Sequence, residues 1–158
     1  MKAAVIYYSK SGKTKAIADK IAAEFDAEVY SVEPQKAYGN YLSAVIRVGG
    51  EIRRKESPAL KTKPGDFSAY DTVFIGFPVW YGTLPSFLQE YIKGSKLGKK
   101  RIIPFATAGA NGKASSLETL RELLPDAEIT DYFYTSRRKQ QDVDAWLREI
   151  AGKETGRI

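Results

Sequence analysis

Residues 9–14 (SKSGKT) have the composition of a short anion-binding loop. Three hydroxyl side chains and two lysines surround a flexible glycine, and N–H groups at the start of a following helix would add donors. This set suits a phosphate dianion, because charge-assisted hydrogen bonds of about 1.5 to 3 kcal/mol each would supply much of the affinity. An ordinary capped helix with a polar turn has a similar composition. The residues concerned are Ser9, Lys10, Ser11, Gly12, Lys13 and Thr14.

Two other kinds of phosphate site fit this segment poorly. Its last three residues match the end of the nucleoside-triphosphate loop G-x-x-x-x-G-K-[ST], but the first glycine of that motif would fall on Tyr7. A bulky strand residue there leaves no room to enclose a second phosphate, so a monophosphate fits better than a triphosphate. A magnesium-dependent receiver domain needs an acidic cluster at the same place, and the sequence there is Tyr7, Tyr8 and Ser9.

Two further segments carry groups that would hold a flat ring. Residues 78–85 (PVWYGTLP) place Trp80 beside Tyr81, and residues 107–113 (TAGANGK) are rich in small residues. Exposed aromatic pairs often mark a binding surface, although both rings could instead belong to the core. Backbone N–H groups of the two segments would bind the polar edge of the ring. We therefore expect a planar, singly phosphorylated ligand.

Composition limits the chemistry that the chain can perform. It has 158 residues, 43% of them hydrophobic, which is enough for a single domain over residues 1–158 with one core. It has no Cys and no His, which excludes disulfides, thiolate chemistry, zinc sites and a His-based general base. We expect no catalytic side chain and no metal site. Without an apolar run of membrane-spanning length or a secretory leader, a soluble, cytoplasmic protein is expected.

The periodicity of apolar residues predicts alternating strands and helices. Strands are expected at residues 2–8, 28–32, 72–77, 101–107 and 128–134, and helices at 13–25, 39–56, 85–93, 115–124 and 142–150. The second and fifth strands carry charges that suit sheet edges, whereas the other three are nearly continuous apolar runs. This predicts a doubly wound, five-stranded parallel α/β sheet of order 2-1-3-4-5, with helices on both faces. The three polar segments would then meet at the carboxyl ends of its central strands.

One feature does not fit this pattern. Pro104 falls inside the fourth strand, where it cannot donate a ladder hydrogen bond. The segment between the second and third strands is long for one connection, but the expected helix at 39–56 within it groups Leu42, Val45, Ile46 and Ile52.

The segments YYSKSGKT, GFPVWYGTLP and PFATAGANG resemble those of the flavodoxins, and more closely a flavodoxin-like subgroup with a G-x-P-x-W-x-G-x-x-P loop. The resemblance runs through nearly the whole chain, and Pro104 recurs in the fourth strand of this subgroup. It implies a flavodoxin-like fold, flavin mononucleotide (FMN) as cofactor and electron transfer as activity. The cofactor-binding residues that it implies are Ser9, Lys10, Ser11, Gly12, Lys13 and Thr14 at the phosphate, Pro78, Val79, Trp80, Tyr81 and Gly82 along the isoalloxazine, and Thr107, Ala108 and Gly109 on its other side.

The sequence is compatible with several functions. We favour an electron carrier over a small FMN-dependent NAD(P)H oxidoreductase acting on quinone-like acceptors. A phosphate-binding regulatory module of the same fold, without redox activity, is the alternative from another class. Expected partners are redox proteins, including acidic ones, or a nicotinamide cofactor, with no nucleic acid and no membrane. The protein would be a monomer or a weak dimer.

The chain departs from typical flavodoxins in charge. It carries a formal net charge of +6, whereas electron-carrying flavodoxins are strongly acidic, and Lys13 stands where many of them have Asn. Topology predicts that residues 93–101 and 53–55 (RRK) lie opposite the flavin, and that residues 137–139 (RRK) lie at the flavin end. Only the last group, with Lys10, Lys13 and Lys36, would steer an acidic partner or a phosphorylated nicotinamide.

Overall fold

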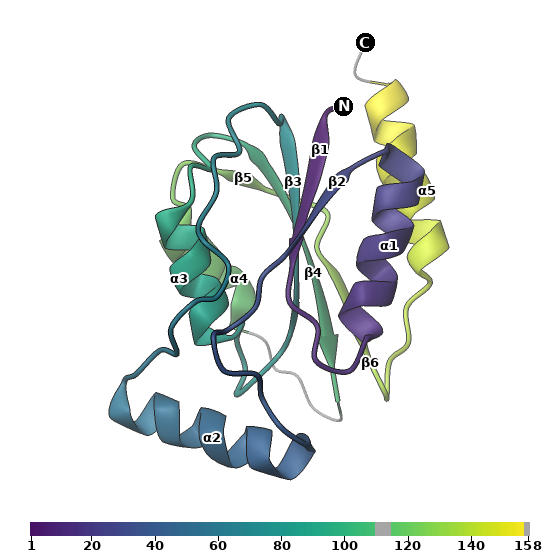
Figure 1. Cartoon of the computed structure of the whole chain (residues 1–158). Helices are drawn as coiled ribbons and strands as arrows, with labels where there is room; N and C mark the ends of the chain where they lie inside the picture. Colours follow the sequence, from purple (N-terminus) through teal and green to yellow (C-terminus); the bar gives the residue numbers. More distant parts are fainter. Residues whose placement is uncertain (110–114, 157–158) are drawn as a thin grey trace.

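The computed structural model describes residues 1–109 and 115–156, which form a parallel sheet between helices (Figure 1). Strands β1 (Ala3–Tyr7), β2 (Glu28–Ser31), β3 (Thr72–Pro78), β4 (Arg101–Ala108) and β5 (Glu128–Ile129) follow the order β2-β1-β3-β4-β5, and β6 (Phe133–Ser136) also pairs with β4. Every pairing is parallel. The expected strand order is confirmed, with a sixth strand added to it.

Four helices cover the two faces of the sheet. Helices α1 (Lys13–Phe25) and α5 (Val143–Thr155) lie on one face, and α3 (Ser86–Gly94) and α4 (Ser116–Leu123) lie on the other (Figure 1). Strand β1 supplies both layers, because Ala4 and Ile6 join the core under α3 and α4, whereas Ala3, Val5 and Tyr7 join the core under α1 and α5. A central strand buried on both sides explains its continuous apolar sequence. Among the described residues, no helix combines the length and apolarity needed to span a bilayer.

The expected fifth strand at 128–134 is wrong as a single strand, because it is interrupted between β5 and β6. Asp131 has φ 55° in the interruption, and its carboxylate accepts a hydrogen bond from Arg101, which is buried and also pairs with Glu154. The same interruption accounts for Pro104. That residue pairs with Ile75 of β3, while neither β5 nor β6 is in register with it on the other side. A proline without an N–H is tolerated where the neighbouring strand is broken.

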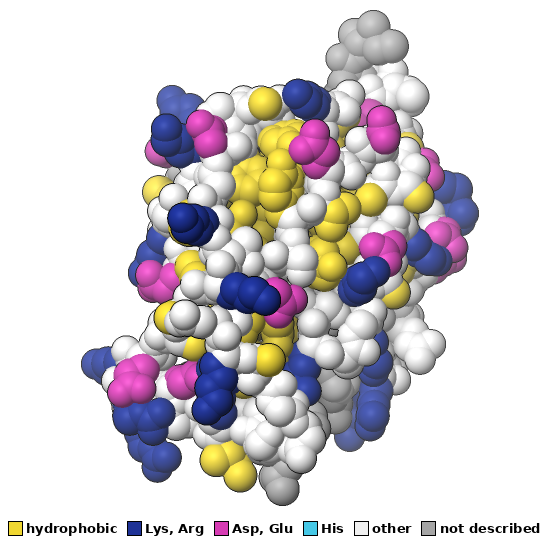
Figure 2. Space-filling view, in the orientation of Figure 1, with side chains coloured by type: hydrophobic (Ala, Val, Ile, Leu, Met, Phe, Trp, Pro, Cys, Tyr) yellow, Lys and Arg dark blue, Asp and Glu magenta, His cyan; other side chains and the backbone are white. Residues whose placement is uncertain are grey.

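Helix α2 (Tyr41–Arg54) does not cover the sheet but lies beyond the carboxyl ends of the strands (Figure 1). Its apolar residues Val45, Ile46 and Ile52 are exposed, Ile46 to 67%. Apolar and basic side chains therefore share the outer surface of this end of the molecule (Figure 2). The inner side of α2 instead buries Val48 and Glu51. Periodicity located this helix correctly but gave no information on the direction of its apolar side.

A close approach between two central strands leads to a stability prediction. Gly76 faces Phe105 across the β3–β4 pair, and a Cβ at position 76 would lie 2.1 Å from Cζ of that ring. We expect Gly76→Ala to lower the free energy of unfolding by about 3 kcal/mol, because the added methyl group would overlap a ring that is fully buried. Gly152→Ala in α5, where a Cβ meets nothing within 4 Å, should change it by less than about 1 kcal/mol. Urea unfolding followed by circular dichroism measures both, and equal effects of the two variants would contradict this packing.

Candidate ligand-binding site at the carboxyl ends of the strands

Three loops meet at the lower end of the sheet in Figure 1, where β1, β3 and β4 end. They contain all the candidate binding residues, Ser9 to Thr14, Pro78 to Gly82 and Thr107 to Gly109. Residues 110–113 of the expected third loop lie outside the described residues. Backbone hydrogen bonds join the loops, since the N–H of Val79 donates to the carbonyl oxygen of Thr107 at 2.8 Å. The structure thus brings the predicted segments together at one edge.

The first loop presents unsatisfied donors at the start of α1. Gly12 has φ 91° and donates its N–H to Ser9 Oγ at 3.1 Å, which bends the chain into the helix. The first helical turn closes with the N–H of Ala16 on the Gly12 carbonyl, and none of the described side chains caps the helix. Within the described residues, the N–H groups of Lys13, Thr14 and Lys15 therefore have no partner. These donors, together with the positive end of the helix dipole, form an anion-binding site.

A buried hydrogen bond ties this loop to the third one. The Oγ1 atoms of Thr14 and Thr107 lie 2.9 Å apart, and both residues are buried. The exposed side chains of Lys10, Ser11 and Lys13 surround the helix start on the solvent side. The loop therefore has a fixed inner side and a polar, positively charged outer side.

The second loop is a tight turn with an unusual backbone. Trp80 and Thr83 exchange both N–H···O=C hydrogen bonds, at 2.8 and 3.2 Å. The residues between them, Tyr81 and Gly82, have φ values of 52° and 82°, as in a type I′ turn. Glycine adopts such values freely, whereas for tyrosine they are strained. The Gly82 carbonyl accepts hydrogen bonds from the N–H and Oγ of Ser115, which fixes the turn to the start of α4.

The two aromatic residues of this turn differ in their surroundings. The indole of Trp80 is half-buried, with ring centroids 5.5 Å from Tyr8 and 4.9 Å from Tyr38 in edge-on contacts. Tyr81 is 58% exposed, and its hydroxyl donates to the Val45 carbonyl of α2 at 3.0 Å. Trp80 therefore belongs in part to the core, and Tyr81 is the more accessible ring. Sequence reasoning placed the pair correctly but could not distinguish their roles.

A cluster that sequence reasoning missed lies behind Trp80. Tyr38 donates a hydrogen bond of 2.7 Å to Glu51, which also accepts one of 2.9 Å from Arg47, and the guanidinium of Arg47 lies over the Tyr38 ring. Burial, followed by the hydrogen bond to Glu51, raises the pKa of Tyr38, so its hydroxyl stays protonated. Burial likewise raises the pKa of Tyr8, with the charge of Glu33 adding to it. The four-residue spacing of Arg47 and Glu51 on a helix was the one signal in the sequence.

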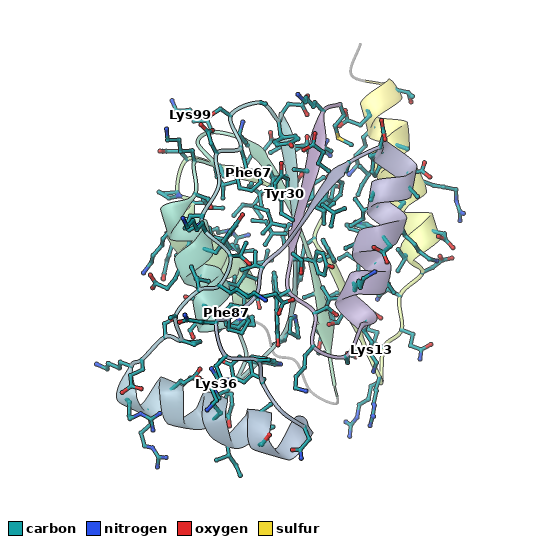
Figure 3. The ribbon with its side chains drawn as sticks, viewed as in Figure 1. Lys13, Tyr30, Lys36, Phe67, Phe87 and Lys99 are labelled. Atoms are coloured by element: carbon teal, nitrogen blue, oxygen red, sulfur yellow. The ribbon has the colours of Figure 1, made fainter. Side chains whose placement is uncertain are left out.

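The basic residues are distributed partly as expected. Lys13 and Lys36 lie toward the binding end and Lys99 lies at the opposite end (Figure 3). The N–H of Arg137 donates to the Gly109 carbonyl at 3.1 Å, so residues 137–139 border the site. Residues 53–55, expected at the opposite end, instead form the end and C-cap of α2, at the binding end (Figure 1). That expectation was wrong because α2 lies beyond the carboxyl ends of the strands and not along the sheet.

The arrangement offers groups that could bind a ligand. The described part of the chain contains no group of three or more His, Cys, Asp or Glu residues able to hold a metal ion. What the loops offer is an anion site at α1, N–H groups of Tyr81 and Gly82 that are not used by the turn, and aromatic rings between them. These features fit a ligand with one phosphate and one flat polar ring.

Comparisons with known proteins identify the family and the fold. A family model described as flavodoxin matches residues 2–150. A candidate flavoprotein from Bacteroides uniformis ATCC 8492 is 26% identical, with a TM-score of 0.79 over 95% of this chain and 97% of its own. A candidate flavoprotein from Bacteroides eggerthii DSM 20697 is 29% identical, with a TM-score of 0.74 over 95% and 98%. No curated protein matches the chain.

A third solved structure was determined with a ligand. A flavoprotein from Lactobacillus acidophilus NCFM, solved in complex with FMN, is 22% identical. It superposes with a TM-score of 0.71 over 92% of this chain and 97% of its own. At this identity the likeness concerns the fold.

The buried pair of threonine hydroxyls allows a direct test of how the loops are joined. We expect Thr14→Val and Thr107→Val each to lower the free energy of unfolding by about 1 to 3 kcal/mol, because each leaves the other hydroxyl buried without a partner. The double variant should cost clearly less than the sum of the two, by at least about 0.5 kcal/mol. Urea unfolding of the four proteins gives the coupling, and strict additivity would show that the two hydroxyls do not interact.

Proposed function

Because the chain belongs to the flavodoxin family, we propose that it binds FMN at the carboxyl ends of the strands and carries electrons through it. When bound, this cofactor accepts and donates electrons one or two at a time. The side chains of the protein need only hold it, shield it and set its surroundings. The observation that carries the proposal is the uncapped start of α1, with three N–H groups that have no partner among the described residues.

The phosphate would be held by the first loop. The N–H groups of Lys13, Thr14 and Lys15 point out of the start of α1, and the exposed hydroxyl of Ser11 adds a further donor. Lys10 and Lys13 are exposed and add positive charge. Ser9 also belongs to the site, since its Oγ fixes the turn at Gly12.

The flavin ring would lie between the second and third loops. Pro78, Val79, Trp80, Tyr81 and Gly82 would border one side, and Thr107, Ala108 and Gly109 the other. The accessible ring of Tyr81 and the N–H groups that the turn itself does not use support this placement. Residues 78–85 and 107–113 contain no Asp or Glu. Without a negative charge in these two segments, the reduced cofactor would be destabilised less, so its reduction potential should be less negative than in acidic flavodoxins.

A comparison of two flavins tests the phosphate site. FMN should bind in a 1:1 ratio, and riboflavin, which lacks the phosphate, should bind at least about 100-fold more weakly, because two or more charge-assisted hydrogen bonds are lost. Lys13→Gln should weaken FMN binding by about threefold to tenfold through the loss of one charge beside the phosphate. Quenching of flavin fluorescence during titration measures these dissociation constants.

Lys99→Gln is the matched control, since Lys99 lies at the opposite end of the molecule (Figure 3). It should leave FMN binding unchanged within about twofold. A purified protein that is colourless and binds neither flavin would overturn the proposal in favour of a phosphate-binding module without redox activity. Steady turnover of NAD(P)H with a quinone would instead identify an FMN-dependent oxidoreductase.

We further propose that the electron partner is an acidic redox protein that docks near residues 137–139. These residues border the third loop through the bond from Arg137 to Gly109. The side chains of Arg137, Arg138 and Lys139 are exposed. Exposed charges of one sign beside a redox site raise the rate of encounter with a partner of opposite sign.

Reversing these charges should slow the encounter. With a small acidic iron–sulfur ferredoxin as the probe, Arg137→Glu combined with Arg138→Glu should lower the second-order rate of electron transfer about tenfold at low ionic strength. The difference should disappear at high salt, where the charges are screened. Stopped-flow absorbance measures the rate. Lys96→Glu combined with Lys99→Glu serves as the control, and an equal loss there would show that only net charge matters.

A further inference from the structure

Helix α2 contacts the aromatic turn of the site from outside the layered core. It touches Tyr81 directly, through the hydrogen bond of 3.0 Å from the tyrosine hydroxyl to the Val45 carbonyl. It also reaches Trp80 through Tyr38, whose hydroxyl is bound by Glu51 and whose ring packs edge-on against the indole. One helix therefore contacts, directly or through one residue, both rings of the turn.

The contact with Tyr81 depends on a glycine. A Cβ at Gly49 would lie 2.8 Å from the hydroxyl oxygen of Tyr81 and 3.4 Å from Cζ of its ring. At the neighbouring Gly50, the three atoms nearest to a Cβ all belong to the flexible guanidinium of Arg54, the closest of them a nitrogen at 3.0 Å. Of these two glycines, only Gly49 therefore lies where the side chain of Tyr81 contacts the helix. Glycine in a helix interior lowers helix stability, so the contact has a cost that packing must offset.

Tyr81 needs such support because of its backbone. Its φ of 52° lies in the left-handed region, which residues with large side chains rarely adopt. Strained conformations of this kind persist when the surrounding structure holds them. Here the hydroxyl of the same residue is held 36 positions away in the chain, on α2.

The helix that holds Tyr81 is itself anchored. Glu51 is only 7% exposed and accepts hydrogen bonds from both Tyr38 and Arg47. Arg47 in turn donates to the carbonyl of Lys36 at 2.8 Å, which ties α2 to the segment that precedes it. Removing one partner from a buried charged network is costly, so α2 is fixed on this side.

We propose that Gly49 is a positioning residue, which lets α2 hold Tyr81 and thereby sets the conformation of the turn that borders the flavin. The inference rests on the proposed function for its consequence, since the turn contacts a cofactor only if FMN binds there. Its structural part, that α2 fixes the backbone of Tyr81 and Gly82, holds with or without FMN. The two parts can therefore be tested separately.

The first test uses the protein without flavin. In Gly49→Ala, the hydroxyl of Tyr81 must shift away from α2. The backbone amides of Tyr81 and Gly82 should therefore shift in the nuclear magnetic resonance spectrum. The amides of Trp80 and Thr83, which are hydrogen-bonded across the turn, should exchange with solvent at least about tenfold faster. Gly50→Ala, with the same gain in helix propensity, should leave all four amides unchanged. Tyr81→Phe, which removes the hydroxyl without a steric change, should give a smaller effect in the same direction. Unchanged amides in both Gly49→Ala and Tyr81→Phe would overturn the proposal.

The second test uses FMN and a double-mutant cycle. Gly49→Ala should weaken FMN binding about threefold to tenfold and shift the visible absorption band of the bound flavin, whereas Gly50→Ala should do neither. The variant Tyr81→Gly keeps the left-handed backbone but has no ring at position 81. The methyl group that Gly49→Ala adds would then have no ring to displace. In that background Gly49→Ala should change the dissociation constant by less than about twofold. An undiminished effect of Gly49→Ala in the Tyr81→Gly protein would show that the glycine acts by another route.

The two tests separate the two proposals. If wild-type protein does not bind FMN while the amides of Tyr81 and Gly82 respond to Gly49→Ala and not to Gly50→Ala, the proposed function fails and the positioning role stands. If FMN binds equally well to all variants and the amides do not move, the positioning role fails and the proposed function stands.

Discussion

The parallel register of β1, β3 and β4 is the constraint on which the site depends. Tyr7 pairs with Gly76 and Pro78 pairs with Thr107, so the three strands end at one edge. These strands are buried on both faces. A slip of one residue would therefore turn the side chains that now pack in one core toward the other core. The packing of the core thus fixes the relative positions of the loops. The bond from Val79 to Thr107 extends the pairing past the sheet and into the site.

This constraint explains which parts of the molecule could be predicted from the sequence. The three central strands are apolar runs, and the polar segments that follow them must meet if the strands are parallel. The break between β5 and β6 was not predictable in the same way, because its cause is tertiary. Arg101 is buried next to Asp131 and Glu154, and the interruption falls beside a proline on the neighbouring strand. The local pattern of apolar residues shows neither the buried ion pairs of Arg101 nor the position of the proline beside the interruption.

Helix α2 shows a second limit of sequence patterns. Its apolar positions indicated a helix, but Val45, Ile46 and Ile52 face outward and the buried side carries Glu51. The inner side buries the small residues Ala44 and Val48 beside Glu51, and it is also held by the hydrogen bonds from Tyr38 to Glu51 and from Arg47 to the Lys36 carbonyl. A hydrophobic pattern predicts the face that packs on the core only where apolar burial dominates. The same reason hides the difference between Trp80 and Tyr81, since their neighbours come from this polar cluster and from α2.

The site therefore has two parts that are held by different forces. The loop of residues 9–14 is fixed to the sheet through the buried Thr14–Thr107 pair and the start of α1. The aromatic turn is fixed from outside, by α2 and by Ser115 at the start of α4. Elements with few buried apolar contacts open at lower free energy than core strands do. Since α2 packs on no sheet face, the position of the aromatic turn depends on a less stable element, whereas that of residues 9–14 depends on the more stable sheet.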